Sequence, residues 1–396
     1  MFSIRRSCQS ALRNSNGLCA YVNGSRRAFS RSIARSKGGL PVYLEPSSTE
    51  LSSLLAIINA RVLLPEHLSR EQEKLVYKQK SRAKLETEPV EVTIGDVTLP
   101  LEHIDRNLLP SRSQSLKDVL SQSETTADWE NVVRVLEGFH SAGIDVKPRW
   151  QESVVRKLNE NGHHALVLKA LQRVKATGLR LSNYAVTKRV LKGAHDRAAQ
   201  ADWEKTETAK ALRYARQIVE LMEEEEHHGA SSRGKMVVEN DWRSKPYVIA
   251  IPTELAAVAA QRHEGDVETV KTLANRLVNA LKQDNFSEFI DRASASCTKT
   301  EADFKNKFTQ TSALIQACDE LFELLAIWNA LKTSRSVLGA EMPLPSEAAE
   351  YEDKIKTALF TGVDGISKLQ TRDGLELRSL YPAYIQDQLK RCTDEA

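Results

Sequence analysis

Two similar turns, 35 residues apart, constrain the fold of this 396-residue chain more than any other feature. Gly143–Val146 and Gly178–Leu181 each have a glycine followed by an aliphatic, a charged and an aliphatic residue. Apolar positions outside the turns keep the same offset: Leu136 corresponds to Leu171, and Val155 to Val190. A repeat of helix, turn and helix with a period in this range is typical of solenoid proteins, in which each unit buries its apolar face on the next.

The rest of the sequence favours helix. Only 12 prolines and 17 glycines interrupt it, and apolar residues recur at helical spacing. One stretch differs: alternating residues on both sides of Gly95-Asp96 predict a β-hairpin of strands 90–94 and 97–99, which is marginal alone and should pack on the helices or on a partner. We therefore predict a mainly all-α protein, a helical-hairpin repeat solenoid or bundle with a small N-terminal β-hairpin.

The apolar periodicity and capping residues predict the positions of the individual helices. Ser69 and Gln72 form a capping-box pattern, Ser182 is a candidate N-cap, and Gly178 is suited to end a helix in the left-handed conformation. Pro382 should bend or delay the last helix. The expected helices cover residues 50–64, 69–85, 127–140, 150–159, 163–177, a segment from 182, 205–226, 252–262, 266–282, 301–332, 346–361 and 375–390.

The first 37 residues have the composition of a mitochondrial transit peptide. They contain eight basic residues and eight serines, and no acidic residue precedes Glu45. Arg27–Ser30 also resembles a matrix-processing site with cleavage after Phe29. These features predict a location in the mitochondrial matrix. A secretory signal and a basic tail that binds nucleic acid remain alternatives.

Charge and composition suggest five segments. Residues 147–216 contain sixteen lysines and arginines against six acidic residues, a net charge of +10, whereas the whole chain is only +3. A Ser-, Gly- and charge-rich stretch follows this basic region. We predict a transit peptide at 1–37, an extension with the hairpin at 38–110, basic helical repeats at 111–228, a linker at 229–251 and a C-terminal helical domain at 252–396.

The turns and their spacing resemble the pentatricopeptide-repeat family, whose repeat has the same length and closes on a Gly-aliphatic turn. The resemblance covers about two repeats, and it implies RNA binding through the first helices and repeat boundaries. By family analogy, residues that read single bases lie near Trp150 and Asn183. Two or three repeats address only as many nucleotides, so docking on structured RNA or on protein is favoured over sequence-specific reading.

The basic side chains of the repeats are the candidate RNA-binding residues. Lysine and arginine bind phosphates without reading sequence, and a solvated cationic face is the alternative interpretation. The candidates are Lys169, Arg173, Lys175, Arg180, Lys188, Arg189, Lys192, Lys210, Arg213 and Arg216.

Patterns for catalysis, cofactors and metals are weak, so we expect no enzyme activity, no cofactor and no small-molecule substrate. Gly229–Met236 matches a phosphate-binding loop up to its lysine, but Met236 replaces the required Ser or Thr, which favours a linker. Two adjacent histidine pairs, 163–164 and 227–228, cannot chelate alone because neighbouring helical side chains diverge.

Cys297, Cys318 and Cys392 are isolated, which favours buried, unreactive thiols. We expect no membrane span because no apolar run approaches the required length.

Together these features resemble the general build of accessory mitochondrial ribosomal proteins. The leading hypothesis is a structural component of the mitochondrial ribosome, with ribosomal RNA and mitochondrial ribosomal proteins as partners. A mitochondrial RNA processing or translation factor of pentatricopeptide type and a respiratory-complex assembly factor are the alternatives. The sequence does not indicate which ribosomal subunit is involved.

Overall fold

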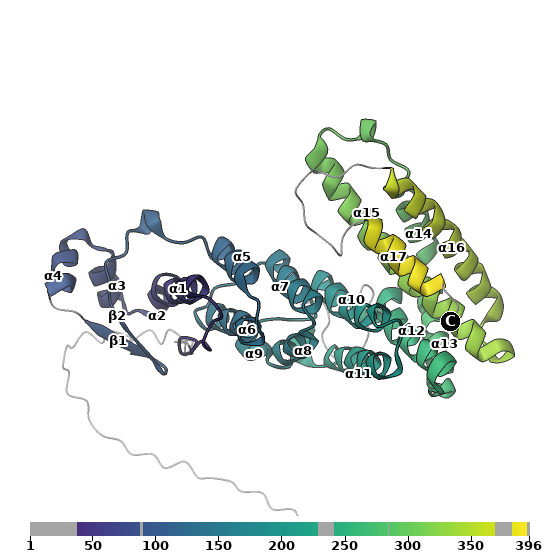
Figure 1. The fold of residues 1–396 in the computed structure, drawn as a ribbon, viewed down its shortest axis with the longest axis horizontal. Coiled ribbons are helices and arrows are strands. Elements are labelled where there is room, and N and C mark those ends of the chain that lie inside the picture. The colour runs from purple at the N-terminus through teal and green to yellow at the C-terminus, as the bar shows by residue number, and fades with distance from the viewer. Residues whose placement is uncertain (1–37, 88–89, 229–240, 284, 369–381, 394–396) are drawn as a thin grey trace, which may run out of the picture. The chain divides into compact units, whose positions relative to one another are not determined.

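The computed structural model describes residues 38–87, 90–228, 241–283, 285–368 and 382–393. Helices make up most of these residues, and their only sheet has two strands (Figure 1). The predicted fold class is therefore confirmed. The predicted transit peptide, the glycine-rich stretch of residues 229–240 and residues 375–381 of the last expected helix lie outside the described residues.

The first helical stretch contains a π-helical turn. Helix α1 (Thr49–Ile57) begins after Ser48, whose side chain accepts a hydrogen bond from the Leu51 amide, and it continues through a π turn (Ile58–Leu63) into α2 (Leu64–His67). The stretch ends at His67, two residues after the expected end near Pro65, because this proline lies in the first turn of α2. Its missing amide hydrogen costs little there.

The predicted charged helix over residues 69–85 is two helices. The capping box between Ser69 and Gln72 is confirmed at the start of α3 (Arg70–Tyr77). The chain then becomes extended at Lys78, forms a 3-10 turn (Gln79–Ser81) and enters α4 (Arg82–Thr87). Val76 and Leu85 would face opposite sides of one continuous helix, and the break allows both to be buried.

The hairpin is confirmed. Strand β1 (Glu91–Ile94) pairs antiparallel with β2 (Val97–Pro100), with Val92 opposite Leu99, and Gly95 takes the positive φ of 64° that the turn needs. Val92 and Leu99 are partly buried and pack on the helical core. The Leu40 amide also donates a hydrogen bond to the Ile94 carbonyl at 3.3 Å, so the segment that precedes α1 contacts the hairpin.

The repeat segment is a run of helix pairs. Gly143 and Gly178 both have a left-handed conformation, with φ values of 75° and 68°, which a glycine adopts without strain. The expected helix over 163–177 is interrupted at Arg173, and the N-cap of the following helix is Asn183 rather than Ser182, because Asn183 Oδ1 accepts from the Ala185 amide. The helices are α5 (Arg112–Gln122), α6 (Thr126–Ser141), α7 (Pro148–Glu160), α8 (His164–Gln172), α9 (Val174–Thr177), α10 (Tyr184–Gln200) and α11 (Lys205–Leu221).

The next helix begins earlier than expected. A 3-10 turn (Trp242–Ser244) leads into α12 (Pro246–His263), so Pro252, the expected start, lies inside the helix. Pro246 occupies the first turn, which suits proline, and the apolar residues after it are buried, so they belong to a core helix rather than to a linker. Helix α13 (Val267–Gln283) follows.

The last four helices pack together around α15 (Figure 1). Helix α15 (Lys307–Leu338) packs against α12 and also against α16 (Pro345–Ser367). Helix α14 (Phe286–Cys297) was not expected from the sequence. Helix α17 (Pro382–Thr393) has Pro382 as its first residue, consistent with the expected delay.

The three described cysteines are free and buried, as predicted. Burial raises the pKa of Cys297 and that of Cys318 to about 12, so both thiols stay protonated and unreactive at neutral pH. No described helix combines the length and apolarity needed to cross a bilayer.

Candidate functional site

The structure separates the ten candidate basic residues into three sets, according to whether their charge faces solvent and whether a carboxylate neutralises it. This distinction matters because a phosphate group can form an ion pair only with a cation that is exposed to solvent.

The first set consists of exposed side chains that form ion pairs with carboxylates of the same chain. Such exposed pairs are worth only about 0–1 kcal/mol, so a phosphate can compete for the cation. The pairs are Lys169–Glu130 at 2.9 Å, Arg173–Glu137 at 2.6 Å, Lys175–Glu226 at 2.5 Å and Lys210–Glu207 at 2.6 Å.

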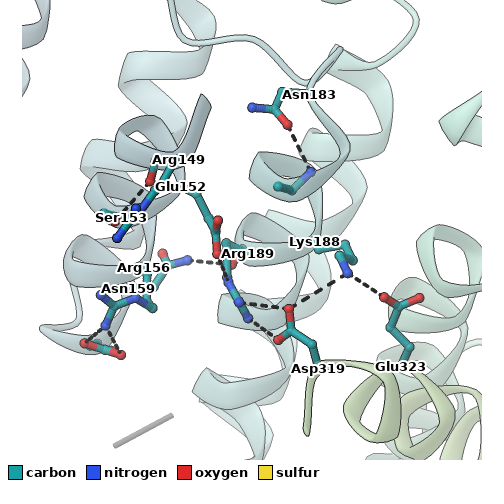
Figure 2. A network of polar contacts seen from close by, with 12 residues as sticks. Arg149, Glu152, Ser153, Arg156, Asn159, Asn183, Lys188, Arg189, Asp319 and Glu323 are labelled. Atoms are coloured by element: carbon teal, nitrogen blue, oxygen red, sulfur yellow. Dashed lines mark hydrogen bonds and ion pairs between the residues drawn. The ribbon is translucent and has the colours of Figure 1, made fainter. Parts of the chain in front are cut away.

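The second set is drawn into an internal ion-pair network (Figure 2). The Arg189 guanidinium donates to both oxygens of Asp319 at 2.6 and 2.9 Å, and its Nε donates to Glu152 at 2.7 Å. Lys188 Nζ donates to Glu323 at 2.7 Å. The network therefore ties α10 to α7 on one side and to α15 on the other.

Arg189 is held within this network with its charge intact. Its side chain is only 6% exposed. Burial alone disfavours the guanidinium, but the carboxylates of Asp319 and Glu152 outweigh that effect and raise the pKa of Arg189. Its charge is thus used to hold helices together and is not available to an external anion.

Lys192 is the third internal residue of this set. Its Nζ lies 3.7 Å from the ring centroid of Phe322, 3.5 Å from that of Tyr384 and 3.6 Å from Asp196. Burial lowers the pKa of Lys192 to about 8, even though Asp196 favours the charged form. An aromatic enclosure of this kind shields the ammonium group from solvent and from RNA.

The third set consists of Arg180, Arg213 and Arg216. All three are exposed, and none forms an ion pair with another described residue. Arg213 and Arg216 lie one turn apart on α11, so they share a face of that helix. These three arginines are the candidates most available to phosphate groups.

The residues that the family analogy suggested as base readers lie on different helices. Trp150 is half-buried on α7, with the Arg149 guanidinium 5.8 Å from its ring centroid. Asn183 uses its carbonyl oxygen to cap α10 (Figure 2).

The two histidine pairs remain separate from any ligand set in the described residues. Burial lowers the pKa of His164 and that of His227, and the His227 ring nitrogen Nδ1 accepts a hydrogen bond from the Leu181 amide. Both rings are therefore neutral at neutral pH.

The structure instead brings His195, Glu254 and Cys392 together, with candidate ligand atoms within 4.8 Å of one another. No sequence pattern predicts this cluster, because its three residues are far apart in the chain. His195 has both ring nitrogens occupied, Nδ1 by Glu254 at 2.7 Å and Nε2 by Gln388 at 3.0 Å. A fully hydrogen-bonded imidazole in a closed core indicates a structural polar network rather than a metal centre.

Asp319 and Glu323 were also not predicted to be functional residues, although their spacing in the sequence is a signal for them. They are four residues apart in α15, so they share one face, whereas Glu320 between them points elsewhere. Paired carboxylates on a face that packs on other helices require cationic partners. Only the three-dimensional structure identifies those partners as Lys188 and Arg189.

Comparison with known proteins identifies one family. The family model described as mitochondrial ribosomal protein mS27 matches residues 27–380. The small ribosomal subunit protein mS27 of Neurospora crassa is 27% identical over 224 residues. That alignment covers 56% of this chain and 56% of the relative, so the chain matches about half of the relative's length.

Proposed function

Because the chain belongs to the mitochondrial ribosomal protein mS27 family, we propose that it is a structural component of the small subunit of the mitochondrial ribosome. In this function it docks on ribosomal RNA and on neighbouring ribosomal proteins, and so supports mitochondrial translation without catalysing a reaction. The observation that carries the proposal is the family match, which extends over residues 27–380. The family also confirms the mitochondrial location expected from the N-terminal composition.

The proposed contact with RNA is electrostatic and uses the cations that face solvent. Arg180, Arg213 and Arg216 are exposed, and none of them forms an ion pair with a described carboxylate. The exposed pairs formed by Lys169, Arg173, Lys175 and Lys210 are weak enough to exchange a carboxylate for a phosphate. The remaining three candidates make contacts inside the protein instead; they are Lys188, Arg189 and Lys192.

We also propose that residues 111–228 form degenerate pentatricopeptide-like repeats. Support comes from the 35-residue spacing of Gly143 and Gly178 and from their shared left-handed conformation before a new helix pair. With so few repeats, the segment serves as a docking platform rather than as a reader of RNA sequence.

Sedimentation of mitochondrial lysate tests the proposed function. The protein should co-migrate stoichiometrically with the small ribosomal subunit, and ribonuclease or removal of magnesium should shift it to lighter fractions. A pentatricopeptide-type processing factor would bind substoichiometrically to messenger or precursor RNA. An assembly factor for a respiratory complex would sediment independently of ribonuclease, and either of these results would refute the proposal.

A charge-reversal variant tests the RNA contact itself. Replacing Arg180 and Arg213 by glutamate should reduce incorporation into the subunit while helix content and thermal stability stay unchanged. Arg70→Glu on α3 is a matched control, because Arg70 is also exposed and lies outside the basic segment. Equal incorporation of the double variant and the control would refute RNA docking through these arginines.

A further inference from the structure

A groove of about 630 Å³ is lined by residues of β2, α1, the π turn and α2. This volume is in the range of sites that enclose a ligand or several side chains of a partner. Residues 59–61 of the lining belong to the π turn, and such turns occur frequently at functional sites. The lining is mainly aliphatic and includes Leu55, Leu64, Leu68, Val76, Leu99 and Leu101.

The outer edge of β2 is open. In an antiparallel pair, hydrogen-bonded residues alternate with residues whose backbone groups point away from the partner strand. The Leu101 amide donates to the Val90 carbonyl at 2.7 Å, and the register therefore directs the backbone groups of Thr98 and Pro100 away from β1. Both residues are exposed, and the Thr98 amide and the two carbonyls have no hydrogen-bond partner among the described residues.

This open edge borders the groove. Leu99 and Pro100 of β2 line the groove, whereas no residue of β1 does. An unpaired strand edge is a template for another strand, and a sheet of only two strands is marginal. The edge of β2 can therefore accept a third strand next to an apolar groove.

The charged residues of the groove favour a polypeptide over RNA. Glu45, Glu102 and Arg61 line it, all three are exposed, and none forms an ion pair with another described residue. Two carboxylates and one guanidinium leave a net negative charge, which repels phosphates and suits a basic peptide. RNA also lacks the alternating N–H donors and carbonyl acceptors that a strand edge binds at intervals of about 7 Å.

We propose that an extended segment of a neighbouring protein pairs with the outer edge of β2 as a third strand. The Thr98 amide donates to the segment, and the carbonyls of Thr98 and Pro100 accept from it. Alternate apolar side chains of the segment enter the groove, and a lysine or arginine of the segment lies near Glu45 or Glu102. The inference rests on the proposed docking on neighbouring ribosomal proteins and specifies the form of one such contact.

Photo-cross-linking in intact mitochondria tests this geometry. In two variants of the full chain, Thr98 or Glu102 is replaced by the photoreactive amino acid p-benzoylphenylalanine, and the cross-linked peptides are identified by mass spectrometry. The two positions are four residues apart in an extended stretch, so their cross-links should fall about four residues apart in one segment of one partner. A helical partner would give a separation of about nine residues, because a helix rises only about 1.5 Å per residue.

A pair of proline variants tests the hydrogen bonds of the edge. Thr98→Pro removes the donor next to the groove, whereas Thr93→Pro makes the same change at the residue opposite it, on the outer edge of β1. Proline is tolerated where the amide of an edge strand points outward. In cells that also express tagged wild type, Thr98→Pro should enter the small subunit about fivefold less than Thr93→Pro, as expected for one net hydrogen bond.

A second pair of variants tests the groove without changing charge. Ala56 is exposed on α1 and lines the groove, so Ala56→Trp should fill it and abolish the cross-link from position 98. Ser53→Trp is the matched control, because Ser53 is exposed on the same helix outside the lining. Circular dichroism and thermal melts establish that all four variants are folded, and the cross-linking itself does not depend on them.

The outcomes separate this inference from the proposed function. If the chain sediments with the small subunit but positions 98 and 102 cross-link to ribosomal RNA, to a second copy of this chain, at helical spacing or to nothing, the inference is overturned and the proposed function stands. If the chain sediments apart from the ribosome, the proposed function fails, and the spacing of the cross-links still identifies the partner of β2. Cross-links at strand spacing that Ala56→Trp abolishes and Ser53→Trp preserves support the inference.

Discussion

Nδ1 of His195 on α10 lies 2.7 Å from the carboxylate of Glu254 on α12, and both side chains are fully buried. The other carboxylate oxygen of Glu254 accepts from Asn329 on α15 at 2.6 Å, and His195 Nε2 pairs with Gln388 on α17. One polar cluster thus joins α10, α12, α15 and α17. Each polar group shown here has a partner, which is the condition for a buried network to stabilise a fold.

The first prediction concerns the pH dependence of stability. Burial disfavours the His195 imidazolium, but the Glu254 carboxylate outweighs this and raises the pKa of His195 above its ordinary value of 6.5. A raised folded-state pKa means that the stabilisation is complete below pH 6.5 and is lost as the pH rises through the folded-state pKa. Urea unfolding over this range should show a fall in the free energy of unfolding that His195→Gln removes.

Comparing the variant with the wild type isolates this effect. Lys192 lies on the same helix and contributes with the opposite sign, since its lowered pKa of about 8 makes stability rise with pH. The Lys192 charge also lowers the pKa of His195, so wild type and His195→Gln are compared in a Lys192→Met background, where neither protein has the Lys192 contribution. If the difference in the free energy of unfolding between the two proteins did not change with pH, the imidazolium–carboxylate pair would be excluded.

The second prediction concerns the network in Figure 2. Asp319→Ala leaves the buried Arg189 guanidinium without its bidentate partner and should lower the free energy of unfolding by about 3–5 kcal/mol. Glu130→Ala is the control, because it breaks only the exposed pair with Lys169 and should cost about 0–1 kcal/mol. If chemical denaturation showed an equal loss of unfolding free energy for the two variants, the Arg189 guanidinium would be solvated rather than buried.

The third prediction compares the two equivalent turn glycines. A Cβ atom at Gly178 would lie 2.7 Å from Nδ1 of His140, whereas one at Gly143 would meet nothing within 4 Å. Alanine should cost about 1–2 kcal/mol at Gly143, from the left-handed backbone alone. At Gly178 the clash should add about 1 kcal/mol, and thermal melts of the two variants measure the difference. The opposite order of stabilities would contradict this account.

The fourth prediction concerns the core of the repeats. Val190 is fully buried on α10, so Val190→Asp introduces an unpaired charge and should cost more than about 3 kcal/mol. Leu168 is only partly buried on α8, and Leu168→Ala should cost about 2 kcal/mol, at the low end for this substitution. Unchanged melts for both variants would show that the proposed repeat register is wrong.

The fifth prediction concerns import. The mature N-terminus should lie between Ser30 and Gly38, where the acid-free basic composition ends. Edman or mass-spectrometric sequencing of the protein from purified mitochondria measures it directly. An intact Met1 in the organelle would contradict the predicted transit peptide.

Local signals predicted much of the fold. The capping box at Ser69, the hairpin around Gly95 and the left-handed Gly178 depend on residues close in sequence, and each is present in the structure. Helix breaks were harder to predict because they satisfy distant contacts. The break at Lys78, for example, lets both Val76 and Leu85 reach the core.

The candidate site was less predictable for a physical reason. A count of charges along the sequence treats Lys175 and Arg189 alike, although one is exposed and the other is enclosed by carboxylates from other helices. Asp319 lies 130 residues from Arg189, and no spacing rule links them. Burial and partner identity are properties of the tertiary structure, so the sequence alone could not sort the cations.

The contacts of Arg189 and Lys188 with α15 also have a consequence for the order of folding. Their carboxylate partners lie 130 and 135 residues downstream. The charges of Arg189 and Lys188 are therefore paired with these carboxylates only after α15 has packed against α10. Contacts of such long sequence separation close late, because chain entropy must be lost before they form. During this interval, the exposed arginine and lysine on α10 would attract any nearby polyanion, so completion of the fold also removes a nonspecific anion-binding site.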